Sequence, residues 1–118
     1  MSDVLLVEDE FVVRELVLEV LTESGLEVVA VGTAEAALEA LGAGPDAFKV
    51  LVTDINLGGP VTGIHIAEQG RTLIPDIKVV YMSGIPSNLY GLADEALMFP
   101  KPFNVEDLAA RIKLLVGS

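Results

Sequence analysis

The sequence predicts one α/β domain with a three-layer, doubly wound (βα)5 architecture, in which helices cover both faces of a parallel sheet. Three observations predict it. Apolar runs of strand length alternate with segments of helical period along the chain. The first run is continuous and begins and ends with valine, as expected of a strand that is buried on both faces. The 118 residues suit a single core. Right-handed crossovers then make the sheet doubly wound, and the expected strand order is 2-1-3-4-5, a common order for such sheets.

Each strand and helix has its own signal. The expected strands are 4–7, 26–31, 48–53, 77–82 and 96–99. The expected helices are 10–24, 34–41, 62–73, 86–94 and 105–116. Gly25 follows the first helix at a position that favours a left-handed residue. Thr33 and Asn104 can each cap the helix that follows. Gly91 interrupts the fourth helix, which is therefore expected to be short.

Composition and charge narrow the possible functions. The formal net charge is -11, from 18 acidic and 7 basic residues, and such a surface repels the phosphates of DNA and RNA. The absence of cysteine excludes disulfides and thiolate metal sites. A strand pattern begins directly after the third residue, so no signal peptide is expected, and no apolar stretch is long enough to span a bilayer. We therefore expect a cytoplasmic protein with no nucleic-acid or membrane partner.

Polar residues follow four of the five expected strands. Glu8 and Asp9 come after the first strand, and Asp54 comes after the third. Ser83 follows the fourth strand and Lys101 follows the fifth. The second strand, which would lie at the edge of the sheet, has no such residue. Because the carboxyl ends of parallel strands share one edge of the sheet, these five side chains are expected to converge there.

This set of residues suits a metal-assisted transfer of a phosphoryl group to a carboxylate. Magnesium prefers oxygen ligands, and clustered carboxylates repel one another without a cation. A carboxylate can attack phosphorus, while a lysine and a hydroxyl can hold the other phosphoryl oxygens. Each residue alone has a simpler explanation: Asp9 as a helix cap, Asp54 as a turn residue and Lys101 as a surface lysine. Their coincidence at one edge favours the site.

Together these residues resemble the receiver domains of bacterial two-component response regulators, a CheY-like family with a flavodoxin-like fold, over the whole chain. The resemblance implies that Asp54 is the phosphoacceptor and is phosphorylated from a phosphohistidine. It also implies that Glu8 and Asp9 bind magnesium, or manganese in its place, together with Asp54 and the backbone carbonyl of Asn56.

The same resemblance implies roles for residues nearer the C-terminus. Ser83 matches the switch hydroxyl of the family and Lys101 matches its phosphoryl-binding lysine. The peptide bond before Pro102 is expected to be cis. Met98 stands where the family usually has a tyrosine or phenylalanine that turns inward, so a flexible side chain replaces the aromatic switch. The loop 57–63 is one residue longer than the family pattern, with its proline displaced.

The expected function is that of a stand-alone receiver domain spanning residues 1–118. It would accept a phosphoryl group from a histidine kinase or a histidine phosphotransfer protein and then change its binding to an output partner that the sequence does not identify. It would not be an enzyme, apart from promoting its own phosphorylation and dephosphorylation. Two alternatives stay open: a pseudo-receiver that binds partners without being phosphorylated, and a receiver excised from a hybrid histidine kinase.

Two other functions fit the fold but not the residues. A flavin-binding protein needs a phosphate-binding loop after the first strand, where this chain has the acidic run 8–10. An aspartyl phosphatase usually carries Asp-x-Asp after that strand, and this pattern is missing. His65, the only histidine, is expected to be an ordinary helix residue.

Overall fold

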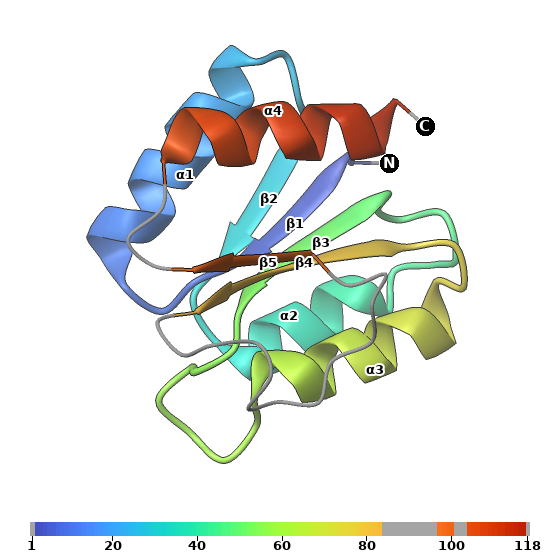
Figure 1. Ribbon diagram of the computed structural model, residues 1–118. Helices are drawn as coiled ribbons and strands as arrows, with labels where there is room; N and C mark the ends of the chain where they lie inside the picture. The colour runs from blue at the N-terminus through green and yellow to red at the C-terminus, as the bar shows by residue number, and fades with distance from the viewer. Residues whose placement is uncertain (1, 84–96, 101–103, 118) are drawn as a thin grey trace.

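A parallel sheet of five strands lies between two layers of helices (Figure 1). The computed structural model describes residues 2–83, 97–100 and 104–117. Its strands are β1 (Val4–Val7), β2 (Val28–Val31), β3 (Val50–Asp54), β4 (Lys78–Ser83) and β5 (Leu97–Pro100). They follow the order β2-β1-β3-β4-β5, so the predicted topology is confirmed. The carboxyl ends of all five strands point toward the same edge (Figure 1).

Helices cover both faces of the sheet, as the doubly wound architecture requires. The described helices are α1 (Phe11–Glu23), α2 (Ala34–Leu41), α3 (Gly63–Leu73) and α4 (Val105–Val116). One face carries α1 and α4, and the other carries α2 and α3 (Figure 1). The predicted helix 86–94 lies outside the described residues. Within the described part of the chain, no helix is long and apolar enough to cross a membrane.

The sheet separates the buried apolar side chains into two clusters. Leu5 and Val7 of β1 face the cluster beneath α2 and α3, whereas Val4 and Leu6 face the cluster beneath α1 and α4. All four side chains are fully buried. Alternate residues of a strand point to opposite faces, so a strand that is covered on both sides must be apolar throughout. This double burial explains why the run 4–7 is continuous rather than alternating.

α2 and α4 have the predicted ends, and those of α1 and α3 lie within one residue of the predicted ones. The hydroxyl of Thr33 accepts a hydrogen bond from the Ala36 backbone N–H at 3.2 Å. The side-chain oxygen of Asn104 accepts from the backbone N–H groups of Glu106 and Asp107. Gly25 has a φ of 88°, the left-handed conformation expected after α1.

β1 has the predicted boundaries, whereas the other four strands differ from the predicted ones by one or two residues. β2 begins two residues later than predicted, because the N–H of Leu26 still bonds to the carbonyl of Leu21 near the C-terminal end of α1. β3 and β4 each continue one residue further than predicted, since Asp54 is in register with Met82 and Ser83 with Pro100. The later ends of β3 and β4 therefore bring two predicted site residues, Asp54 and Ser83, into the sheet ladder.

Candidate functional site

Three of the predicted carboxylates meet at the carboxyl edge of the sheet. One oxygen from each of Glu8, Asp9 and Asp54 lies within 4.8 Å of the other two. Glu8 is 0% exposed and Asp54 is 6% exposed, whereas Asp9 is open to solvent. Acidic side chains are rarely buried to this extent unless a partner or a cation compensates their charge. The geometry therefore marks this cluster as a site rather than a solvated acidic surface.

The backbone of Glu8 makes two hydrogen bonds that fix its position. Its N–H donates to the carbonyl of Val31 at the end of β2, at 3.1 Å. Its carbonyl accepts a hydrogen bond from the Arg14 guanidinium of α1, at 2.9 Å. Both contacts come from elements other than β1. They fix the direction in which the chain leaves the strand, and they thereby direct the Glu8 side chain toward the cluster.

Asp9 does not serve as the cap of α1. The N-cap residue is Glu10, and its side chain makes no capping hydrogen bond. The simpler explanation of Asp9 as a helix cap is therefore wrong. The loop after β3 approaches this carboxylate instead: a side chain built on Gly58 would begin 3.5 Å from an oxygen of Asp9. Gly58 has a φ of 75°, a conformation that glycine adopts without strain.

Asp54 is the last residue of β3, and its neighbours fix both its backbone and its side chain. The fully buried Thr53 hydroxyl donates to the Asp54 carbonyl at 2.9 Å. The Asn56 backbone N–H donates to Oδ1 of Asp54 at 3.1 Å, which is an Asx turn. This turn orients the plane of the carboxylate. It also places Asn56 beside the cluster, as the resemblance requires of a residue that offers its carbonyl to a cation.

The donor set of the cluster fits a hard divalent cation. Glu8, Asp9 and Asp54 offer carboxylate oxygens, the ligands that Mg²⁺ or Mn²⁺ takes together with water. Two of these carboxylates are buried side by side, so their like charges repel each other, and a bound cation would reduce this repulsion. When bound there, the cation would also offset negative charge on an incoming phosphoryl group.

The remaining predicted residues are placed only in part. Ser83 is the final residue of β4, at the same edge as the carboxylates, and its backbone is in register with Pro100. Met98 lies in β5, in register with Tyr81. The side chains of Ser83 and Met98, and the whole of Lys101 and Pro102, lie outside the described residues, so their roles stay predictions.

Sequence reasoning missed three residues that support the site: Arg14, Thr53 and Gly63. A side chain on Gly63 would collide with the carbonyl of Asp54 and would lie 2.9 Å from the Thr53 hydroxyl. Two of the three residues carried a usable signal. Glycine often marks a place where another group approaches the backbone closely. Arg14 is the single basic residue in a helix rich in glutamate.

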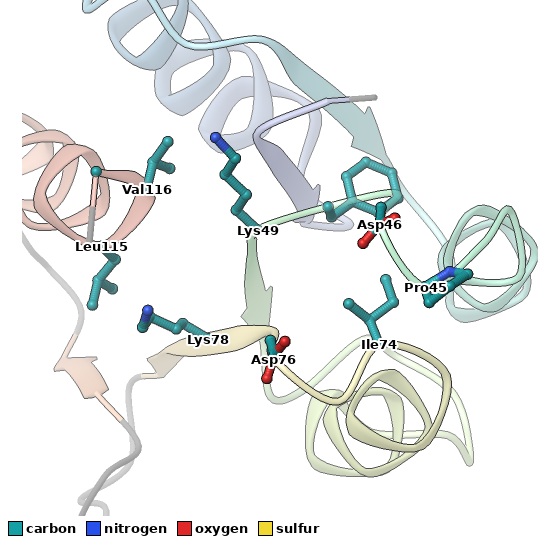
Figure 2. A pocket seen from close by; sticks show the side chains of 10 residues that line it. Pro45, Asp46, Lys49, Ile74, Asp76, Lys78, Leu115 and Val116 are labelled. Carbon is teal, nitrogen blue, oxygen red and sulfur yellow. The ribbon is translucent and has the colours of Figure 1, made fainter.

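A groove lies at the opposite edge of the sheet, where β3 and β4 begin (Figure 2). Its volume is about 800 Å³, and Lys49, Lys78, Asp46 and Asp76 are among the residues that line it. Lys49 also forms an ion pair with Asp3, with a nitrogen–oxygen distance of 3.8 Å. Because lysines and carboxylates share this groove, its charge selects neither an anion nor a cation. The carboxylate cluster remains the candidate site.

Comparisons with known proteins agree with this assignment. The chain is 37% identical over 96 residues to the response regulator protein FleR of Pseudomonas aeruginosa, in a match that covers 81% of this chain and 19% of FleR. The chain thus spans about a fifth of the length of that relative. It is 28% identical to the response regulator receiver protein CpdR of Brucella abortus, over 100% of both chains.

A solved structure extends the likeness to three dimensions. The crystal structure of a response regulator receiver protein from Sinorhizobium medicae is 28% identical to this chain and has a TM-score of 0.89 with it. That match covers 99% of this chain and 95% of the other.

Residues 4–113 match the response regulator receiver domain family. Receiver domains are signalling modules rather than classical enzymes. In general they accept a phosphoryl group, bind Mg²⁺ through acidic residues and interact with histidine kinases and output domains. The parallel sheet, the carboxylates at its carboxyl edge and the family match lead to one conclusion: this chain belongs to the response regulator receiver domains of two-component systems.

Proposed function

We propose that this chain accepts a phosphoryl group on Asp54 from a histidine kinase or a histidine phosphotransfer protein, in a reaction that depends on Mg²⁺, and that phosphorylation changes its binding to an output partner. One observation carries the proposal. Asp54 is a buried carboxylate that ends a central strand, and its side chain lies within the cluster formed with Glu8 and Asp9. The proposed nucleophile and the two proposed ligands of the cation are carboxylates that lie close together, and this supports the proposal.

The chemistry assigns different work to the three carboxylates. An oxygen of Asp54 would attack phosphorus, the bond from phosphorus to the donor imidazole would break, and its electron pair would return to the imidazole nitrogen. Glu8 and Asp9 would keep the cation beside the reacting group. The Asn56 N–H, which already holds Oδ1 of Asp54, fixes the carboxylate plane for in-line attack. Ser83 and Lys101 are proposed to bind the transferred group.

The surface beside the cluster supports the proposed phosphodonor. Phe11 and Val12 begin α1 directly after the acidic loop, and their side chains are 65% and 76% exposed. Leu16 continues this apolar surface one turn further along the helix and is 48% exposed. Large apolar side chains that remain exposed beside a reactive group favour docking of a protein over binding of a small molecule.

We propose further that residues 1–118 act as a stand-alone receiver in the cytoplasm. The end-to-end match to CpdR supports this arrangement. The much greater length of FleR supports the alternative, in which a receiver of this kind is one part of a longer protein such as a hybrid kinase. A pseudo-receiver that is never phosphorylated is the other alternative, and the carboxylate cluster argues against it.

Asp54 phosphorylation is tested by incubating the protein with acetyl phosphate and magnesium and measuring its intact mass. The wild-type protein should gain one phosphoryl group. Asp54→Asn and a wild-type sample treated with a chelator should gain none. Asp46→Asn is the matched control, since Asp46 is an exposed acid outside the cluster, and it should react like the wild type. Equal mass gain in Asp54→Asn, or no effect of chelation, would contradict the proposal.

A further inference from the structure

We propose that Arg14 is a positioning residue for the cation site, and that Gly32 is glycine because a side chain there would displace the Arg14 guanidinium. Arg14 is not proposed as a ligand of the cation, because a guanidinium is positively charged and has no acceptor atom. It acts through the backbone of Glu8, whose carbonyl it binds. The inference rests on the proposed function, because it assigns Glu8 to a bound cation.

The hydrogen bond from Arg14 to Glu8 connects α1 to the end of β1, two parts of the fold whose relative position must stay fixed. Arg14 lies in the first turns of α1, and its NH1 donates to the Glu8 carbonyl at 2.9 Å, six residues back along the chain. Between the two residues lies the turn that contains Asp9. The hydrogen bond therefore closes this turn, and the positions of both acidic residues depend on it. Outer contacts of this kind orient the groups that bind a metal.

The guanidinium is held in place by two further residues. Its carbon lies 5.5 Å from the centre of the Phe11 ring, an arrangement of cation and aromatic face that stabilises the side chain. On another side it lies against the backbone of Gly32, just after β2. A Cβ atom on Gly32 would come within 2.7 Å of NH1 of Arg14 and 3.8 Å of the Glu8 carbonyl oxygen. Real Cβ contacts do not reach 2.7 Å, so a side chain at this position would push the guanidinium away.

Two possible roles of Arg14, one through its charge and one through positioning, predict opposite effects of its removal on cation binding. If Arg14 acted only through its positive charge, removing it would strengthen cation binding, because the site would become more negative. If Arg14 positions Glu8, removing it weakens cation binding. Gly32→Ala separates the two effects further, because it displaces the guanidinium while leaving the net charge unchanged. Gly32 does not have a positive φ, so alanine fits its backbone conformation.

The experiment measures magnesium affinity by calorimetry and the rate of Asp54 phosphorylation by acetyl phosphate, in the full chain. Arg14→Gln and Gly32→Ala should each lower the affinity for magnesium by about tenfold, the effect typical of outer contacts at a metal site. The double variant should lose little more than either single variant, since both changes break the same contact. Arg111→Gln removes an equal charge from the exposed surface of α4 and should bind magnesium like the wild type. Circular dichroism checks that each variant is folded.

The outcomes separate this inference from the proposed function. Unchanged affinity in Gly32→Ala, or higher affinity in Arg14→Gln, would overturn the positioning role. A third result would overturn the inference but leave the proposed function standing. In that case the wild type is phosphorylated on Asp54, and both variants bind magnesium and react as well as the wild type does. Failure of the wild type itself to be phosphorylated on Asp54 would instead contradict the proposed function.

Discussion

Tyr81 is a residue on which burial and a nearby charge act in opposite directions. Its side chain is 1% exposed and belongs to the core beneath α2 and α3. Burial raises the pKa of the Tyr81 phenol above its usual value of 10.0, because the charged form would lose its hydration. The Arg71 guanidinium of α3, which lies near the phenol and shares a hydrogen bond with it, lowers that pKa and so offsets part of the effect of burial.

The raised pKa predicts how stability changes in alkaline solution. Below pH 10 the phenol is protonated in both the folded and the unfolded states, so Tyr81→Phe should lose only the hydrogen bond to Arg71, within about 1.5 kcal/mol. Above pH 10 the unfolded wild-type chain releases the proton while the folded state retains it. The stability advantage of the wild type over Tyr81→Phe should therefore shrink as the pH rises. Urea denaturation at pH 8 and pH 11 measures this difference, and a constant difference would contradict the prediction.

At the residue scale, the sequence was sufficient to predict which carboxylates meet but not what supports them. Glu8 and Asp54 directly follow two of the expected strands and Asp9 is one residue further on, so their place at the sheet edge follows from strand topology alone. The contact from Arg14 to Glu8 depends on the path of a long side chain to a backbone oxygen. No periodicity of the sequence encodes such a path. Supporting contacts of this kind become visible only when the backbone is in place.

The start of α3 is the element whose packing most directly fixes the reactive carboxylate. The N–H of Gly63, its first residue, donates to the Ile55 carbonyl at 2.8 Å. The helix can come this close to the end of β3 only because Gly63 has no side chain, since a Cβ atom would collide with the Asp54 carbonyl. The chain after β3 thus folds back, and the start of α3 packs against the end of β3.

Gly63→Ala should therefore destabilise the protein by about 1–3 kcal/mol, the usual effect of overpacking against backbone. It should also slow phosphorylation, because relief of the collision must move either the helix or Asp54. Gly59→Ala is the matched control in the same loop, since a Cβ atom there would meet nothing within 4 Å. Its stability should stay within about 0.5 kcal/mol of the wild type. Chemical denaturation and the acetyl phosphate assay test both variants, and equal effects of the two substitutions would contradict this explanation.

The elements themselves were predictable where periodicity and end signals agreed. α2 and α4 have the bounds that the sequence predicts, and each begins at a side chain that caps it. The strands were less exact, because their limits depend on pairing with neighbours that lie far away in the sequence. Ser83 illustrates this dependence: it belongs to β4 because Pro100 of β5 is in register with it. A strand read by itself contains no information about that partner.

At the scale of the whole molecule, the parallel sheet separates two edges of different character. The carboxyl edge holds the buried acids, whereas the opposite edge holds the groove with Lys49 and Lys78 (Figure 2). A net charge of -11 makes the folded chain repel itself, and the buried acids add to this repulsion locally. A cation that binds the folded state and not the unfolded chain would relieve both effects.

Magnesium should therefore raise the melting temperature of the protein. The expected stabilisation grows with the logarithm of magnesium concentration, reaching about 2.7 kcal/mol at a hundredfold excess over the dissociation constant. Asp9→Asn should weaken this response because it removes one ligand of the proposed site. Asp76→Asn, at the opposite edge of the sheet, should respond like the wild type. Thermal unfolding at a series of magnesium concentrations makes the comparison, and equal stabilisation of both variants at every concentration would contradict a site at the carboxylate cluster.

The meeting of Glu8 and Asp54 also has a consequence for the lifetime of the folded state. Glu8 follows β1 and Asp54 is the last residue of β3, and these two strands pair side by side in the sheet although they are far apart in the sequence. The two carboxylates come together only after these strands have paired, so a cation bound by both would connect the strands late in folding. Interactions that form after the folding barrier slow unfolding and leave the folding rate unchanged. Magnesium should thus prolong the time that each molecule stays folded, and chelation should shorten it without changing how fast the chain refolds.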